Sequence, residues 1–208
     1  MNKFSIKSSF REKVKKVKEL AVEKGLWRML GSVAQYALYY VTDRRSFVYF
    51  EFSLEQEPIS LQLPDPPVAR LATTADLNRI NAEIFPLLTG EYEYDKRYFK
   101  LLVQEGVLCF LAEQDGKFVH YSWVFTNAEQ SPLMDVPFKH SKLKAGDVYM
   151  GPVFTSPNAR GTWIYPFVIT KIIHYLKDYT DKKRLLLFVH GKNPSAVNFF
   201  LRMGFKKI

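Results

Sequence analysis

The sequence is poor in cysteine, because Cys109 is the only one among its 208 residues. A single cysteine excludes an intramolecular disulfide, and the absence of a CxxC pair or a Cys/His cluster excludes a conventional structural zinc site. We therefore expect no metal, and a protein suited to a reducing compartment such as the cytoplasm.

Long hydrophobic runs are also lacking. The longest aromatic-rich stretch, residues 27–41, has 15 residues and is interrupted by Arg28 and Gln35, whereas a membrane-spanning helix takes about 20 apolar residues. The N-terminus does not show the short basic region, apolar core and small-residue cleavage site of a secretory signal. We expect no transmembrane helix and a cytoplasmic location.

Excess positive charge is confined to the N-terminal quarter. Residues 1–50 contain 11 Lys/Arg and 4 Asp/Glu, while residues 51–208 contain 19 and 17. Phe10, Val14, Val17 and Ala21 recur at helical spacing, and lysines occupy the other sides. This pattern predicts a basic amphipathic helix.

Three interpretations of this N-terminal arm stay open. The helix packs on the main domain, or it lies on an anionic membrane surface at the inner face of the membrane, or it docks an acidic partner such as an acyl carrier protein. Nucleic acid is disfavoured as a partner, because no DNA- or RNA-binding motif accompanies the charge.

A proline-rich connector marks the predicted domain boundary. Before it, "SFVYFEFSLE" alternates apolar and polar residues and predicts a strand. Pro58, Pro64, Pro66 and Pro67 then exclude a helix or a central strand. We divide the chain into an arm with one strand (1–58), a connector (59–67) and a main domain (68–208).

The first half of the main domain combines two helices with a hairpin. Thr73 and Asp76 form an approximate capping box before a first helix, and "DKRYFKLLVQEG" predicts a second helix closed by Gly106. Asp115-Gly116 separates two apolar runs, which is the strongest short signal for a β-hairpin.

The second half alternates strands and helices. "GDVYMGPVFTSP" predicts a strand that Gly151-Pro152 interrupts with a bulge or splay. A helix follows from about Trp163, then the buried strand "KRLLLFVH", a short helix after Asn193 and a last strand from "GFKKI". These elements predict an α/β fold with a mixed sheet and flanking helices.

From Asp147 to Phe205 the chain resembles the GNAT superfamily of acyl-CoA-dependent N-acyltransferases. The resemblance rests on the strand "VYMGPVFTSP", the loop "ARGTWIY" and the closing signature "NPSAVNFFLRMGF", and extends more loosely back to about Val68. It implies a GNAT-like mixed sheet with flanking helices, preceded here by the basic amphipathic arm.

The resemblance also implies that residues 160–165 bind the pyrophosphate of an acyl-CoA. A helix N-terminus after a flexible loop presents unsatisfied amides and the positive end of the helix dipole. The family has glycines after the Arg160-Gly161 pair, and this sequence has Trp163 and Tyr165, whose amides remain. Donor binding is thereby assigned to Val153, Phe154, Thr155, Arg160, Gly161, Thr162, Trp163, Ile164, Tyr165, Asn193, Ser195 and Phe200.

Attack of an amine on a thioester needs a polarised carbonyl and a base. By resemblance, the main chain of Val153 and Thr155 holds the pantetheine arm and polarises the carbonyl. The candidates for the base are Tyr149, Asp147 and His120, although a histidine in such a strand is more often a hydrogen-bonded structural residue.

Protonation of the departing thiolate is a separate requirement. In much of the family a tyrosine supplies this proton, and this sequence has Phe200 at that position. The proton then comes from water or the Ser195 hydroxyl, or the step needs no side-chain acid.

These observations predict an N-acyltransferase that moves an acyl group, in the first instance acetyl from acetyl-CoA, to a primary amine of a small-molecule acceptor. One alternative keeps the chemistry and takes the acyl group from an acyl carrier protein. Another is a non-catalytic protein that binds an acyl thioester, a membrane or a partner.

Overall fold

The structure is a computed structural model that describes residues 47–208 except 60, 62, 64–65 and 136–137. The chain divides into two units, Met1–Phe47 and Val48–Ile208, and the described residues belong almost entirely to the second. The predicted basic helix and the stretch 27–41 lie outside the described residues. Within the described part, no helix combines the length and apolar character that crossing a membrane requires.

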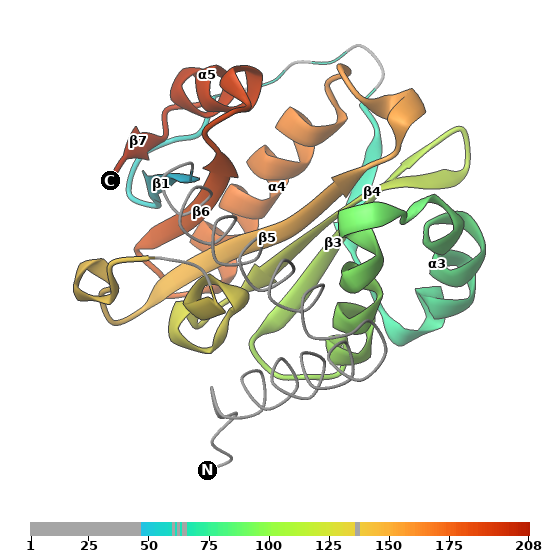
Figure 1. The fold of residues 1–208 in the computed structure, drawn as a ribbon, viewed down its shortest axis with the longest axis horizontal. Helices are drawn as coiled ribbons and strands as arrows, with labels where there is room; N and C mark the ends of the chain where they lie inside the picture. The colour runs from blue at the N-terminus through green and yellow to red at the C-terminus, as the bar shows by residue number, and fades with distance from the viewer. Residues whose placement is uncertain (1–46, 60, 62, 64–65, 136–137) are drawn as a thin grey trace, which may run out of the picture. The chain divides into compact units, whose positions relative to one another are not determined.

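A seven-stranded mixed sheet forms the centre of the second unit (Figure 1). Its spatial order is β2-β3-β4-β5-β6-β1-β7, with β5 parallel to β6 and antiparallel pairing from β2 through β5 and between β1 and β7. The strands are β1 (Phe47–Ser53), β2 (Val68–Leu71), β3 (Val107–Gln114), β4 (Lys117–Phe125), β5 (Asp147–Thr155), β6 (Arg184–His190) and β7 (Lys206–Lys207). The predicted fold class is confirmed.

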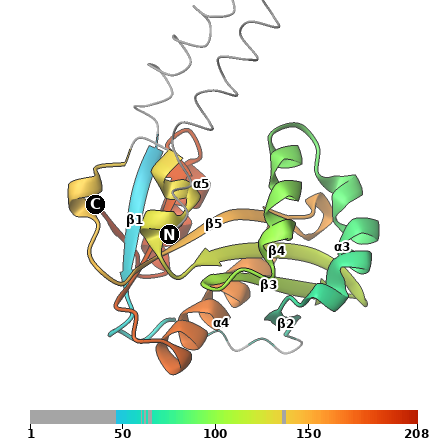
Figure 2. The same cartoon turned by 90° about the horizontal axis from the view of Figure 1, so that it is seen from below.

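Helices cover both faces of the sheet (Figure 2). One face carries α4 (Ile164–Tyr179) and α5 (Pro194–Arg202), and the other carries α3 (Leu77–Glu83) and the 3₁₀ helix η3 (Gly90–Leu101). The remaining 3₁₀ turns are η1 (Thr74–Asp76), η2 (Phe85–Leu87), η4 (Ala128–Gln130), η5 (Pro132–Asp135), η6 (His140–Lys142) and η7 (Pro157–Ala159).

Alternation along the strands divides the interior into two apolar cores. The predicted inward residues of the first strand, Phe50 and Phe52, are 0% and 1% exposed and pack with α4 and with Phe200 of α5. On the opposite face, Tyr121 and Trp123 of β4 pack against η3 and α3. Because successive side chains of a strand point to opposite faces of the sheet, the same strands contribute residues to both cores.

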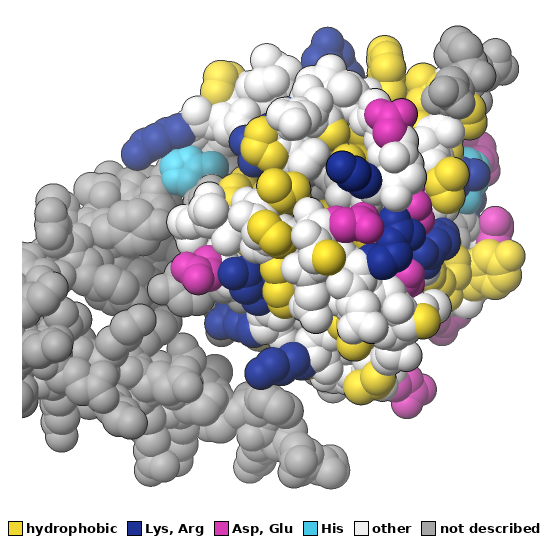
Figure 3. Space-filling view, turned by 90° about the vertical axis from the view of Figure 1, so that its right-hand side faces the viewer, with side chains coloured by type: hydrophobic (Ala, Val, Ile, Leu, Met, Phe, Trp, Pro, Cys, Tyr) yellow, Lys and Arg dark blue, Asp and Glu magenta, His cyan; other side chains and the backbone are white. Residues whose placement is uncertain are grey.

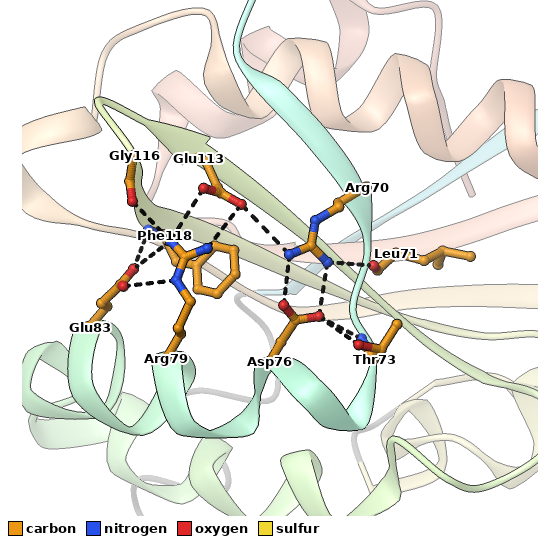
Figure 4. Close-up of polar contacts among 9 residues, drawn as sticks. All are labelled: Arg70, Leu71, Thr73, Asp76, Arg79, Glu83, Glu113, Gly116 and Phe118. Atoms are coloured by element: carbon orange, nitrogen blue, oxygen red, sulfur yellow. Dashed lines mark hydrogen bonds and ion pairs between the residues drawn. The ribbon is translucent and has the colours of Figure 1, made fainter.

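A polar network fastens α3 to the β3–β4 hairpin (Figure 4). Arg70 makes a bidentate ion pair with Asp76, at 2.6 and 2.8 Å. Arg79 bonds to Glu83 and Glu113, lies 4.0 Å over the Phe118 ring and donates to the Gly116 carbonyl at 2.9 Å. The Arg70 guanidinium holds the pKa of the Asp76 carboxyl well below its usual range, so this pair stays charged in neutral solution.

Basic and acidic side chains intermix on the face that Figure 3 shows, which is the right-hand side of Figure 1. This distribution agrees with the near balance of charge in residues 51–208, where 19 Lys/Arg stand beside 17 Asp/Glu. The positive excess of the chain therefore belongs to the N-terminal residues.

Several predicted elements are confirmed, and two differ. The Thr73–Asp76 capping box, the Asp115-Gly116 hairpin, the helix start at Trp163 and the Asn193 cap are present. The second helix lies earlier than predicted and has 3₁₀ geometry, and β2 was not predicted. Its four residues directly precede the capping box, and its pairing with β3 is a long-range contact that local patterns do not reveal.

The proposed boundary at the proline-rich connector remains a prediction. Strand β1, which precedes the connector, pairs with β7 at the C-terminus of the chain. Residues on both sides of the connector thus contribute to one sheet.

Candidate active site

A cavity opens where β5 and β6 part. The two strands pair from Asp147 opposite Arg184 to Tyr149 opposite Leu186, and no pair is found beyond that point in the described part of the chain. Residues 150–153 of β5 and 187–190 of β6 line a cavity of about 670 Å³ there. The register of β4 against β5 also shifts between Ser122 and Val124, which confirms the interruption predicted at Gly151-Pro152.

Gly151 is required by this geometry for two reasons. Its φ of +145° is a backbone conformation that favours glycine, and a Cβ at this position would lie 2.6 Å from the Tyr149 hydroxyl oxygen. The main chain of β5 and the Tyr149 hydroxyl consequently approach one another closely at the point where the strands part.

The loop before α4 leaves backbone amides without partners. Gly161 has φ of +75°, and no described residue accepts a hydrogen bond from the amides of Gly161, Thr162 or Trp163. The Thr162 hydroxyl donates to the Ala159 carbonyl at 2.7 Å, and the Arg160 Nε donates to the Thr155 carbonyl at 3.0 Å. These side chains fix the loop while its amides remain available at the N-terminus of a 16-residue helix.

The two residues that replace family glycines behave differently. Trp163 has ordinary backbone angles, φ of −80° and ψ of 0°, and its side chain is 60% exposed. Tyr165 lines the cavity, where its ring lies 5.4 Å from the His120 ring and 6.0 Å from the Phe200 ring. Neither side chain removes the amide of its own residue.

Six of the predicted donor-binding residues line the cavity and six do not. Those that line it are Val153, Thr155, Arg160, Tyr165, Asn193 and Phe200. Those outside the lining are Phe154, Gly161, Thr162, Trp163, Ile164 and Ser195. The side chains of Phe154 and Ile164 are buried in the two cores, and Asn193 caps α5 by accepting a hydrogen bond from the Ala196 amide at 3.0 Å.

Tyr149 is the predicted base candidate that lines the cavity. Its ring is stacked on Phe188, with centroids 6.0 Å apart. Burial raises the pKa of its phenol far above the usual range, and neighbouring tyrosines and Asp95 add to the effect. Its hydroxyl is therefore protonated at neutral pH and can donate a hydrogen bond.

His120 lies behind the cavity wall. Its Nδ1 is 2.8 Å from the Thr155 hydroxyl and its Nε2 is 2.8 Å from the Ser122 hydroxyl. The ring is fully buried, and this burial lowers the pKa of His120 to about 3. A neutral imidazole that bridges two hydroxyl groups is suited to hold the end of β5 in place.

Asp147 lies at the start of β5 and outside the cavity lining. Its carboxylate accepts hydrogen bonds from Arg184 at 2.6 and 2.9 Å and from the Lys144 amide at 2.8 Å. Arg184 also bonds to Glu51 at 2.6 Å, so this group of charges ties β1, β5 and β6 together.

The cavity also has a wall that the sequence patterns did not indicate. Tyr92, Asp95, Arg97 and Tyr98 of η3 line it from the face opposite α4. Three of these residues, Tyr92, Asp95 and Tyr98, are each three positions apart. This spacing is the one feature of the sequence that could have indicated that they share a face of a helix. In the described part of the chain, no cluster of His, Cys, Asp and Glu could hold a metal ion.

Comparisons with known proteins agree with this geometry. Residues 74–205 match the model of the acetyltransferase (GNAT) family. An aminoglycoside N-acetyltransferase, AAC(6')-Iy, solved with a bisubstrate analog of CoA, matches with a TM-score of 0.52 and 12% identity over 68% of this chain and 92% of its own. No curated protein matches the sequence.

A second solved structure is a conserved protein of unknown function from Staphylococcus epidermidis. It matches with a TM-score of 0.51 and 9% identity over 78% of this chain, which spans 57% of the length of that protein. At such identities the likeness concerns the fold.

Proposed function

The chain belongs to the acetyltransferase (GNAT) family, and from this premise we propose that it transfers an acyl group from an acyl-CoA to a primary amine. The observation that carries the proposal is the cavity of about 670 Å³ between the parting strands, bordered by the loop that leads to unpaired amides at the start of α4. An elongated thioester with a pyrophosphate at one end fits both features.

The donor occupies the α4 side of this cavity in our proposal. The amides of residues 161–163 bind the pyrophosphate, because a helix N-terminus with unpaired N–H groups favours an anion. Arg160 adds positive charge from the cavity lining. The pantetheine arm follows β5 along Thr155 and Val153 towards the gap between the strands, where the thioester lies.

The reaction joins the amine nitrogen to the acyl carbon. The C–N bond forms as the C–S bond breaks, the CoA thiolate takes up one proton, and the acceptor ammonium loses its protons to the thiolate and to solvent. Main-chain N–H groups of the interrupted strand β5 stabilise the negative charge that develops on the carbonyl oxygen.

Tyr149 takes the role of a hydrogen-bond donor in this proposal. Its raised pKa keeps the phenol protonated, so it can donate a hydrogen bond to the oxyanion or to the departing sulfur. Phe200 supplies only an apolar wall, since it has no hydroxyl. His120 acts as a positioning residue through Thr155.

A ligand that binds only the folded state tests the donor. At about 100-fold excess over Kd, such a ligand stabilises a protein by about 2.7 kcal/mol, which raises Tm by roughly 5–10 °C in a chain of this size. We expect this shift with acetyl-CoA or a longer acyl-CoA, and mass spectrometry should show acylated amine and free CoA. No shift at millimolar CoA would refute the proposal.

Donation by an acyl carrier protein is a second candidate, favoured by the 11 Lys/Arg against 4 Asp/Glu in residues 1–50. Carrier proteins present acidic surfaces, so charge attraction would guide the encounter. Acyl transfer from the carrier protein but not from acyl-CoA, and its loss at high salt, would favour this donor.

A further inference from the structure

Tyr165 brings a phenol to the cavity from the first turn of α4. It is the second residue of this helix, which begins at Ile164, and it lines the cavity together with Phe200. Its ring is stacked on the Phe199 ring, with centroids 5.6 Å apart, and lies edge-on to the Phe200 ring at 6.0 Å. A third ring, that of His120, lies 5.4 Å away. These contacts fix the Tyr165 ring against β4 and α5.

The Tyr165 hydroxyl has no hydrogen-bond partner among the described residues. The side chain is partly buried, and burial raises the pKa of its phenol well above the usual range, without a contribution from any charge or hydrogen bond. The phenol is therefore protonated at neutral pH and has an O–H to donate. Because a tyrosine with a buried ring usually finds a partner for its hydroxyl, this wall of the cavity favours a ligand atom that accepts a hydrogen bond.

A second phenol, that of Tyr149, reaches the same cavity from the other face of the sheet. Tyr165 packs with the apolar core on the α4 face, and Tyr149 belongs to the core on the η3 face. Burial first, and then the charges of Tyr98 and Tyr165, raise the pKa of Tyr149, which places the two phenols within electrostatic reach of one another. The Tyr149 hydroxyl adjoins Gly151, where β5 has parted from β6. The two phenols therefore flank the gap in which we place the thioester.

The proposed donor path passes the Tyr165 side of this gap first. The pantetheine arm runs from the start of α4 along Thr155, whose hydroxyl lies 2.8 Å from Nδ1 of His120. The ring of this histidine is the one that lies beside Tyr165. Sulfur is the last atom of the CoA part, and the acyl carbonyl lies beyond it. A phenol on the α4 face therefore meets the sulfur, and a phenol on the opposite face meets the carbonyl oxygen.

We infer that Tyr165 is a catalytic residue that donates a hydrogen bond to the donor sulfur as the C–S bond breaks. The electron pair of that bond passes to the sulfur, and the phenol stabilises the thiolate while it keeps its own proton. The thiolate then takes up a proton that the acceptor ammonium releases. This role rests on the proposed acyl-CoA function and leaves the carbonyl oxygen to Tyr149. A glycine, which the family has at position 165, could not supply this hydrogen bond.

The pKa of the thiol of bound CoA tests this role without knowledge of the acceptor. CoA carrying an isotope label at the carbon next to sulfur is bound to the full-length protein, and its NMR signal is followed against pH as the thiol ionises. A hydrogen bond to the thiolate lowers the pKa of the thiol, which is ordinarily about 8.5. We expect Tyr165→Phe to raise the pKa of the bound thiol by about one pH unit, a roughly tenfold change in its ionisation constant.

Tyr165→Phe keeps the ring and its contacts with Phe199 and Phe200, so the variant should bind CoA as tightly as the parent does where the thiol is protonated, at about pH 6. Tyr175→Phe is the matched control. It removes a phenol hydroxyl from the same helix at a position outside the cavity lining. This control should leave both the affinity for CoA and the pKa of the bound thiol unchanged.

The outcomes separate the role of Tyr165 from the proposed function. If CoA does not bind the parent protein, the acyl-CoA function is overturned, together with the role that rests on it. If CoA binds and the thiol has the same pKa in Tyr165→Phe as in the parent, donor binding stands and the role of Tyr165 is refuted. A shift in Tyr149→Phe alone would refute it as well, because the sulfur would then face Tyr149.

Discussion

Replacing Gly161 by valine tests the proposed pyrophosphate site. Gly161 has φ of +75°, and a Cβ built there meets no atom within 4 Å. The folded protein therefore has room for the side chain, and the cost comes from the backbone, where a left-handed conformation costs an L-residue roughly 1–2 kcal/mol. Chemical denaturation should show this loss in the free energy of unfolding, and Tm should fall by roughly 2–8 °C.

Donor binding should fall by more than this strain explains. The valine side chain occupies open space beside the amides of residues 161–163, where we propose that the pyrophosphate lies. Losing one hydrogen bond to a charged group costs about 1.5–3 kcal/mol, so Kd for CoA should rise roughly 10- to 100-fold. Calorimetric titration with CoA measures this change directly.

Gly116→Val provides a matched control in the β3–β4 hairpin. Gly116 has φ of +71°, and its Cβ position is equally open. This variant should lose similar stability and bind CoA as the parent does. If Gly161→Val also binds CoA as the parent does, residues 160–165 do not bind the pyrophosphate and the assignment is wrong.

Further predictions concern separate parts of the chain. Trp163→Gly should keep CoA affinity, because the amide survives, while the helix start loses up to about 1 kcal/mol; a large drop in affinity would instead assign the indole to the donor site. The pKa of His120 falls to about 3 in the folded state, so its contribution to stability is complete above pH 6.5 and is lost as the pH falls towards 3. The free energy of unfolding should decrease by up to about 1.4 kcal/mol per pH unit in this range. His120→Gln should reduce this slope when the free energy of unfolding is measured against pH. The Arg70–Asp76 ion pair stabilises the folded protein at pH values above the unfolded-state pKa of Asp76, about 3.9, and this stabilisation is lost as the pH falls further. Arg70→Met should therefore lower the free energy of unfolding by about 1 kcal/mol at pH 7 and by less at pH 3. Deleting residues 1–28, which carry 9 Lys/Arg and 3 Asp/Glu, should weaken binding to anionic vesicles and leave CoA affinity unchanged; a parent protein that ignores such vesicles at low salt would refute the membrane interpretation.

Local patterns were sufficient for the elements that build the α4 side of the cavity. A buried apolar run predicts β6, the Gly151-Pro152 pair predicts the interruption of β5, and Asn193 predicts the start of α5. Each signal depends on residues adjacent in sequence. The β5–β6 pairing ends at Tyr149, two residues before Gly151, so the interruption of β5 and the parting of the two strands occur at neighbouring positions.

The η3 wall could not be predicted in the same way. The aromatic residues of segment 90–101 are Tyr92, Tyr94, Tyr98 and Phe99, which include a pair spaced by four and none spaced by three, so their pattern does not indicate 3₁₀ geometry. The contact of Asp95 with Tyr121 joins residues 26 positions apart, and the stack of Tyr149 on Phe188 joins residues even further apart. Such long-range contacts depend on how the layers pack, so a site that depends on them is visible only in the folded chain.

The substitutions that set this loop apart from its family are compatible with the proposed site for a structural reason. A phosphate needs the amide of each loop residue, and glycine is needed only where φ is positive or a side chain would intrude. Only Gly161 in this loop has positive φ, while Trp163 has ordinary angles and a side chain that is 60% exposed. Tyr165 directs its ring towards Phe199 and Phe200, where it completes an aromatic wall. The chain can therefore replace two glycines, keep the amides that an anion requires, and gain a ring on the wall of the cavity.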